Sequence, residues 1–182
     1  LILTSPLQLM FTRFVADRLF ENQHRLVLGN LFGALCVTFL TAGVVGAAAL
    51  ALWFDGSLFY RQCMLTGFVT LCGIWMVVIF ASAIKAYQQI LVVFLLGYGI
   101  TVAVSLALHN FGLTGLLLGF VMGQVCLFFT LLALVARQYP GDIMVSFAFL
   151  RRAQIYPSLI WTGLFYNLGA WADKFIFWAD PL

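Results

Sequence analysis

The side chains best suited to binding a ligand lie in the last apolar segment of the chain. They are Tyr166, Asn167, Trp171, Asp173 and Lys174. At 100° per residue on a helix, Tyr166 and Asp173 share one face, and the other three share the adjoining face. Amide and carboxylate groups hydrogen-bond sugar hydroxyls, and an indole ring stacks on a sugar ring. Polar groups at membrane depth indicate function, so these five residues predict a transport cavity that binds carbohydrate.

A second interpretation of the same residues stays open. Lys174 lies about 6 Å along a helix axis from Trp178, close enough to the segment's end for its ammonium group to reach the interface. Asp173 would then be its ion-pair partner. On this interpretation the pair serves structure and binds no cargo.

Motifs for catalysis are missing from the sequence. It contains no GxxxxGK[ST] loop, no HExxH pair and no carboxylates spaced for glycosyl chemistry. Its four cysteines form no CxxC pair and lie in apolar runs, as expected of small packing residues. The net charge of +3 comes without a basic run, which argues against nucleic-acid binding. We therefore expect a protein that is not an enzyme and uses no cofactor or metal.

The elements that carry these residues are membrane helices. Hydrophobic residues make up 64% of the chain and charged residues 8%, against about a quarter charged in soluble domains. Residues 86–136 contain no Asp, Glu, Lys or Arg. As one helix they would extend about 75 Å, more than twice a bilayer's hydrocarbon thickness. They must cross the membrane twice, with the turn at 109–112, so the expected fold class is an all-α, polytopic transmembrane helix bundle.

The same length rule divides the whole chain into six apolar segments. The first, up to about Phe14, is too short to span and is expected to be the tail of a cut helix, followed by a polar turn over 13–25. Five full spans are expected at about 26–54, 58–84, 88–108, 112–136 and 156–178.

Charges in the connections predict the orientation. Seven of the nine cations fall on one side if the 13–25 turn is cytoplasmic, and two fall on the other, which is a positive-inside bias. The cytoplasmic cations include Arg137, Arg151 and Arg152, which we call the basic rim. The segment Asp142–Arg152 has an acid at its start and arginines at its end, which suits a short interfacial helix on the cytoplasmic face.

Small residues and one proline predict packing details. Gly115, Gly119 and Gly123 repeat every four residues, as in tightly packed membrane helices; a stripe facing the transport path is the alternative. Gly29 and Gly33 are likewise four residues apart, at the start of the second apolar segment. Pro6 lies inside the first segment and should kink its helix.

Two stretches carry a family resemblance: Leu3–Glu21 (LTSPLQLMFTRFVADRLFE) and Tyr166–Trp178 (YNLGAWADKFIFW). They resemble the inner-membrane exporter of the Pel exopolysaccharide system, a family of the multidrug/oligosaccharidyl-lipid/polysaccharide (MOP, MATE-like) flippase superfamily. Members of that superfamily have two lobes of six helices around a central cavity. The resemblance implies that residues 1–138 hold the end of the second helix and helices three to six, 139–153 the cytoplasmic linker, and 154–182 the first, truncated helix of the second lobe.

The resemblance also implies a function. It is export of a cationic, amino-sugar-rich biofilm polysaccharide across the bacterial inner membrane, among membrane lipids. The exporter would work beside a cytoplasmic glycosyltransferase and membrane regulatory subunits. The basic rim of Arg137, Arg151 and Arg152 would then be where these partners dock. Two alternatives stay open. One is a related antiporter or lipid-linked oligosaccharide flippase with another cargo, and the other is a non-transporting scaffold of a polysaccharide synthase complex.

Overall fold

The computed structural model describes residues 2–83, 87–139, 145–151 and 156–179, and within them the chain is all helical apart from its connections. Six α-helices and two 3-10 turns follow in order: α1 (Ser5–Phe20), α2 (Arg25–Trp53), α3 (Leu58–Ala83), α4 (Tyr87–Ala107), η1 (His109–Phe111), α5 (Gly112–Gln138), η2 (Ala148–Leu150) and α6 (Pro157–Ala179). The predicted all-α fold class is confirmed.

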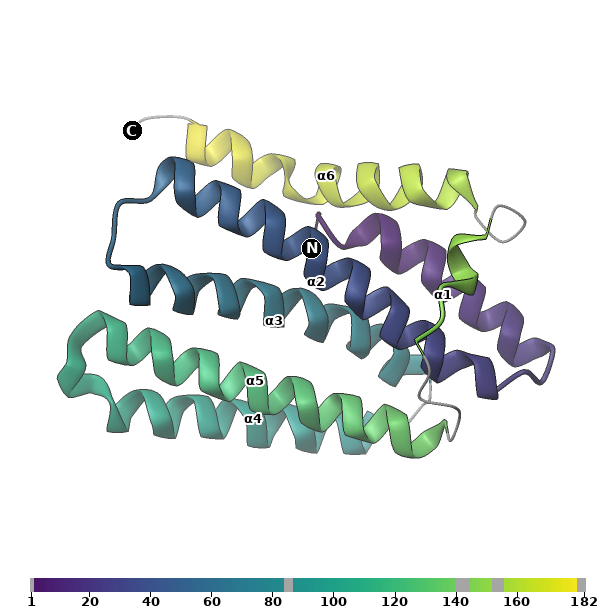
Figure 1. The fold of residues 1–182 in the computed structure, drawn as a ribbon, viewed down its shortest axis with the longest axis horizontal. Coiled ribbons are helices and arrows are strands. Elements are labelled where there is room, and N and C mark those ends of the chain that lie inside the picture. Colours follow the sequence, from purple (N-terminus) through teal and green to yellow (C-terminus); the bar gives the residue numbers. More distant parts are fainter. Residues whose placement is uncertain (1, 84–86, 140–144, 152–155, 180–182) are drawn as a thin grey trace.

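The helices form two groups, and α1 joins them because it contacts α2 and α3 in one group and α6 in the other. In the first group α4 pairs with α5, α5 packs on α3, and α3 packs on α2; in the second, α6 packs mainly on α1 (Figure 1). Helices α2, α3, α4 and α5 are long and apolar enough to cross a membrane. The chain is thus a multi-pass membrane protein. Helix α6, predicted as a fifth span, is not among those four.

The bounds of α2 to α5 agree with the predicted spans to within two residues. The predicted turn between α4 and α5 is also confirmed: η1 occupies 109–111, and Gly112 has a φ of 65°. That backbone conformation is strained for residues with a Cβ atom and easy for glycine. These helices are apolar on almost every face, so length and turn residues alone fixed their bounds.

The predicted polar turn over 13–25 is wrong in its first half, because α1 continues to Phe20. The helix ends in a Schellman motif. The N–H of Gln23 donates to the Arg18 carbonyl at 2.9 Å, and the N–H of Asn22 donates to the Leu19 carbonyl at 3.1 Å. Asn22 has a φ of 57°, which asparagine tolerates better than most residues.

The kink predicted at Pro6 is also wrong. Pro6 is the second residue of α1, within the first turn. No residue of the helix needs its missing N–H there, and its fixed φ suits the start of a helix. The sequence pattern placed Pro6 inside a longer apolar segment, whereas the helix begins beside it.

The segment Val145–Arg151, which we call the strap, is irregular except for η2, so the helix predicted over Asp142–Arg152 is not formed there. Residues 142–144 and 152 lie outside the described residues. The strap lies on α2. The N–H of Ser146 donates to the Gly29 carbonyl at 3.0 Å, and the N–H of Phe149 donates to Asn30 Oδ1 at 3.3 Å.

Tertiary packing explains why the strap is not helical. Phe149 is fully buried, with its ring centroid 5.3 Å from that of Phe11 and 6.4 Å from that of Phe14. A side chain of this size gains roughly 1.5–3 kcal/mol from burial. A helix lying on the surface would leave both the phenylalanine and Asn30 without these partners.

The glycine stripe of α5 packs on α4, as predicted. A Cβ atom on Gly119 would lie 2.5 Å from both the N and the Cα of Ser105, and one on Gly123 would clash with Thr101. On α2, a Cβ atom on Gly33 would instead meet the Ser146 carbonyl of the strap. The alternative that the α5 stripe faces a transport path does not fit these contacts.

The four cysteines are free thiols. Cys63 and Cys72 are buried, as predicted, whereas Cys36 and Cys126 lie on exposed faces.

A buried polar contact joins α4 and α5: Gln124 Nε2 donates to Thr101 Oγ1 at 3.5 Å.

Candidate functional site

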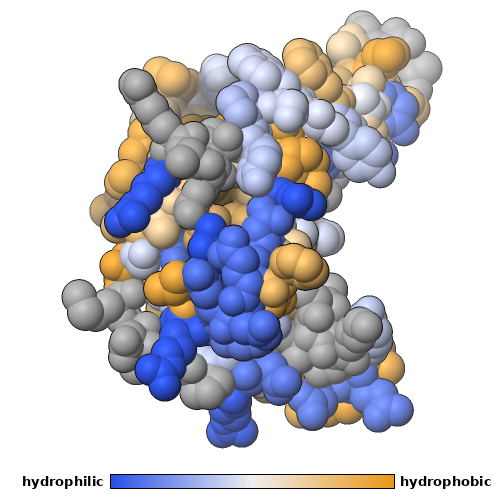
Figure 2. All heavy atoms as spheres, turned by 90° about the vertical axis from the view of Figure 1, so that its right-hand side faces the viewer, coloured by the Kyte–Doolittle hydropathy of each residue, from blue (hydrophilic) through white to orange (hydrophobic). Residues whose placement is uncertain are grey.

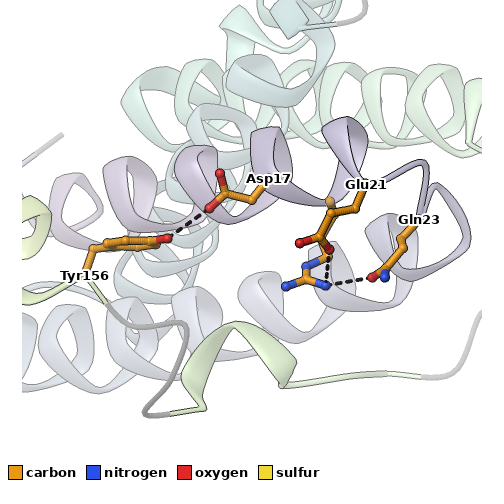
Figure 3. Close-up of polar contacts among 5 residues, drawn as sticks. Asp17, Glu21, Gln23 and Tyr156 are labelled. Atoms are coloured by element: carbon orange, nitrogen blue, oxygen red, sulfur yellow. Dashed lines mark hydrogen bonds and ion pairs between the residues drawn. The ribbon is translucent and has the colours of Figure 1, made fainter.

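Helix α6 carries the five residues predicted to bind cargo, and α1 holds it in place at two points. In the second turn of α6, Gly163 is buried, and a Cβ atom there would lie 2.6 Å from the Ser5 carbonyl oxygen. At the start of α6, the Tyr156 hydroxyl donates to Asp17 Oδ2 at 3.1 Å (Figure 3). The close backbone contact and the hydrogen bond together fix which face of α6 turns away from α1.

Asp17 also joins a small cluster at this junction. Its Oδ1 lies 3.1 Å from Arg13 Nη2, one turn earlier on α1, a spacing at which opposite charges on a helix meet. The Arg13 guanidinium lies over the Tyr156 ring, 5.8 Å from its centroid. One carboxylate therefore accepts from two side chains and links the two helices.

Three of the five predicted residues come together. Lys174 Nζ lies 3.5 Å from Asp173 Oδ2 and 5.2 Å from the centroid of the Trp171 ring. The Asp173 side chain is 74% exposed and that of Lys174 is 48% exposed. Exposed ion pairs contribute about 0–1 kcal/mol, so this pair does little for stability and is open to a ligand.

The other two residues do not join that group. Tyr166 is 74% exposed. Asn167 is half-buried, and its Nδ2 donates to the Gly163 carbonyl of its own helix at 3.3 Å. The structure thus presents one carboxylate, one ammonium group and one indole as a cluster, with the tyrosine hydroxyl on a neighbouring part of the same helix.

The predicted basic rim lies at the opposite end of α6, where the strap and the ends of α2 and α5 meet. Arg137 and Arg151 are both exposed there, and Arg152 lies outside the described residues. Figure 2 shows that hydrophilic side chains gather at this end of the bundle. On α1, Arg18 is held by Glu21 at 2.6 Å and by Gln23 at 2.7 Å, so it contributes less free charge to the end face.

Aromatic contacts close the bundle beneath the rim. The Tyr139 ring is stacked near His24, with centroids 6.4 Å apart, and meets Phe80 edge-on at 6.2 Å. Burial raises the pKa of Tyr139, so its hydroxyl stays neutral at physiological pH. These contacts tie the end of α5 to the start of α2 and set the position of Arg137.

In the described part of the chain, no group of three or more His, Cys, Asp or Glu side chains is placed to hold a metal ion. What the α6 residues offer is hydrogen bonding, one negative and one positive charge, and a ring face. Groups of these kinds can bind a polar ligand. Neither Asn30 nor Asp17 stands out in the sequence by its composition or surroundings. The four-residue spacing of Arg13 and Asp17 is nevertheless a signal for the Asp17 ion pair.

Comparison with known proteins assigns the chain to a family. No curated protein and no solved structure matches it significantly. A family model described as "PelG: Putative exopolysaccharide Exporter (EPS-E)" matches residues 1–182, which is the whole chain. The match agrees with the resemblance carried by the two quoted stretches and with the multi-pass helical fold. The chain belongs to the PelG family of exopolysaccharide exporters.

Proposed function

We propose that this protein exports a Pel-type polysaccharide, a cationic amino-sugar polymer of the biofilm matrix, across the bacterial inner membrane. The observation that carries the proposal is the open cluster of Asp173, Lys174 and Trp171 on a helix of an exopolysaccharide exporter family member. An exposed carboxylate attracts a cationic sugar, and an indole face binds both cations and sugar rings. Tyr166 and Asn167 add hydrogen-bonding groups beside the cluster.

The proposal gives the parts of the chain different roles. Helices α1 to α5 form part of the first lobe, the strap belongs to the linker, and α6 begins the second lobe, with its exposed face lining the central cavity. The basic rim lies on the cytoplasmic side, which follows the positive-inside rule. We infer that Arg137, Arg151 and Arg152 face a cytoplasmic glycosyltransferase or membrane regulatory subunits there, since arginines repel a cationic polymer and attract acidic protein surfaces.

Variants of the α6 cluster test the proposal. Asp173→Asn removes the charge at nearly constant volume, and Trp171→Ala removes the ring. Both should lower secreted polymer at unchanged membrane abundance, because Asp173 is exposed, Trp171 is half-buried and neither belongs to the buried core. Secreted polymer is measured in culture supernatants and protein abundance by immunoblotting of membranes.

The Asp173–Lys174 pair needs its own control, because removing one partner changes the other. Lys174→Ala and the double variant Asp173→Asn/Lys174→Ala complete the cycle. If both single variants fail and the double variant exports normally, the two residues form a structural pair. If every variant exports at the wild-type level, α6 does not line the cavity.

A further inference from the structure

A groove separate from α6 lies along α2, α3 and α5. Its volume is about 330 Å³, within the range of small-ligand sites. All three helices are long and apolar enough to span the membrane, so the groove lies at membrane depth. Gln62, on its wall, is in the second turn of α3, and Thr70 is eight residues further on, or about 12 Å deeper.

One wall of the groove is a polar stripe. Gln62, Thr66 and Thr70 all line it, and their spacing of four places them along one side of α3. The Thr66 hydroxyl donates to the carbonyl of Gln62 at 2.9 Å. Thr70 is only 8% exposed, yet within the described part of the chain its hydroxyl has no hydrogen-bond partner. The Thr70 side chain lines the groove, and at membrane depth, where no water is at hand to bond it, an unpaired hydroxyl favours a ligand that carries polar groups.

The facing wall is aromatic and preformed. The ring centroids of Phe39 and Phe128 lie 5.6 Å apart, and those of Phe128 and Phe129 lie 5.2 Å apart. Gly73 leaves space for these rings: a Cβ atom there would lie 2.6 Å from Phe39 and 2.9 Å from Phe128. Phe129 is 61% exposed, so its ring is accessible beside the groove.

The lining contains no charged side chain. A protonated amine in this groove would therefore lose water without gaining a counter-charge, which is far more costly than burying a hydroxyl. An acyl chain would fit the rings and would leave the Thr70 hydroxyl unpaired. A ligand with hydroxyl groups on its edge and C–H groups on its face satisfies both walls.

We propose that this groove binds an uncharged pyranose ring, with its hydroxyls on Gln62, Thr66 and Thr70 and its C–H face on the phenylalanines. The inference that the ring belongs to the exported polymer rests on the proposed function. The chain then has two sugar sites of different chemistry: the α6 cluster for cationic units and this groove for neutral ones.

Filling the groove tests the site. Gly43 lines it, and a Cβ atom there would meet nothing within 4 Å, so Gly43→Leu should occupy the groove without displacing a neighbour. The matched control is Gly99→Leu on the exposed face of α4, where a Cβ atom also meets nothing within 4 Å. Saturation-transfer NMR with methyl β-glucoside on protein in nanodiscs should give a signal for wild type and Gly99→Leu and none for Gly43→Leu.

The polar stripe has its own test, and so does the expectation that the uncharged groove disfavours a protonated amine. Thr70→Val keeps the side-chain shape and should weaken glycoside binding by about fivefold, the effect of one hydrogen bond. Thr130→Val is the control, because the exposed Thr130 hydroxyl bonds only its own helix. A glycoside with a protonated amine replacing one hydroxyl should bind more weakly than the neutral glycoside.

Three results would overturn this proposal. They are no signal with wild-type protein, equal signals from Gly43→Leu and Gly99→Leu, or a co-purifying phospholipid lost only in Gly43→Leu. Thermal melting of each variant shows whether it folds, and Thr70→Val still decides the matter if Gly43→Leu does not. Binding is measured without transport, so a failure here leaves the export result for α6 unaffected, and the reverse also holds.

Discussion

At the residue scale, the candidate cargo-binding side chains follow from the sequence, but their grouping does not. Polar and aromatic residues in an apolar segment identified the α6 residues. The structural interpretation of Asp173 and Lys174 predicts a contact between the two, and the structure shows it at 3.5 Å. Helical spacing placed Tyr166 with Asp173, yet it takes no part in that contact. Spacing defines a face of a helix, whereas the rotamers of long side chains decide which groups touch.

Asn30 is the residue on which the attachment of the strap most depends. It is fully buried, donates to the Leu26 carbonyl at 2.7 Å and accepts from the Phe149 N–H. Asn30→Leu keeps a similar volume and leaves that N–H buried without an acceptor, which costs about 1–3 kcal/mol. We expect a clearly lower melting temperature in detergent.

The control for this variant is Asn167→Leu. Asn167 is half-buried and bonds only a carbonyl of its own helix, so its loss should leave the melting temperature nearly unchanged. A wild-type melting temperature for Asn30→Leu would show that the strap is not held by this contact.

At the scale of elements, prediction succeeded where local sequence decides the structure and failed where distant contacts do. The bounds of α2 to α5 follow from apolar length and from turn residues such as Gly112. The end of α1 and the strap do not: charged residues suggested a turn where the helix continues, and an acid-to-arginine pattern suggested a helix where Phe149 enters the core. The contacts of Phe149 with Phe11 and Phe14 on α1 cannot be seen in the local sequence of the strap.

The close contact between α4 and α5 predicts that a larger residue at Gly119 destabilises the protein. A side chain at Gly119 would meet the backbone of Ser105, 2.5 Å from a Cβ atom, and a backbone cannot move aside as a flexible side chain can. Gly119→Leu must therefore separate the two helices, with an expected loss of about 1–3 kcal/mol from overpacking. The readouts are the melting temperature and the amount of protein in membranes.

Gly99→Leu is the matched control, since it adds the same side chain to an open face of α4. It should leave both readouts near wild type. If Gly119→Leu were as stable and abundant as the control but failed to export, the glycine stripe would belong to the transport path instead of the helix contact.

At the scale of the whole molecule, the arrangement separates the bundle of α2 to α5 from α6, which packs mainly on one neighbour, α1. Helices α2 to α5 pack on one another in sequence, whereas α6 packs mainly on α1 (Figure 1). Most of α6 is exposed, and so are three of its cargo-binding candidates, Tyr166, Asp173 and Lys174. The two sugar sites that we propose occupy different groups of helices, one on α6 and one on the bundle.

The central claim is that this protein moves the polymer from the cytoplasm to the outside. The most direct measurement is the amount of polymer in the cytoplasmic and extracellular fractions of a strain that lacks the protein but keeps the synthase. We predict that polymer disappears from the outside and is found in the cytoplasmic fraction, and that the wild-type protein reverses both changes. Wild-type amounts outside the cell would contradict the claim, and a complete loss of polymer from both fractions would contradict it in favour of a scaffold of the synthase.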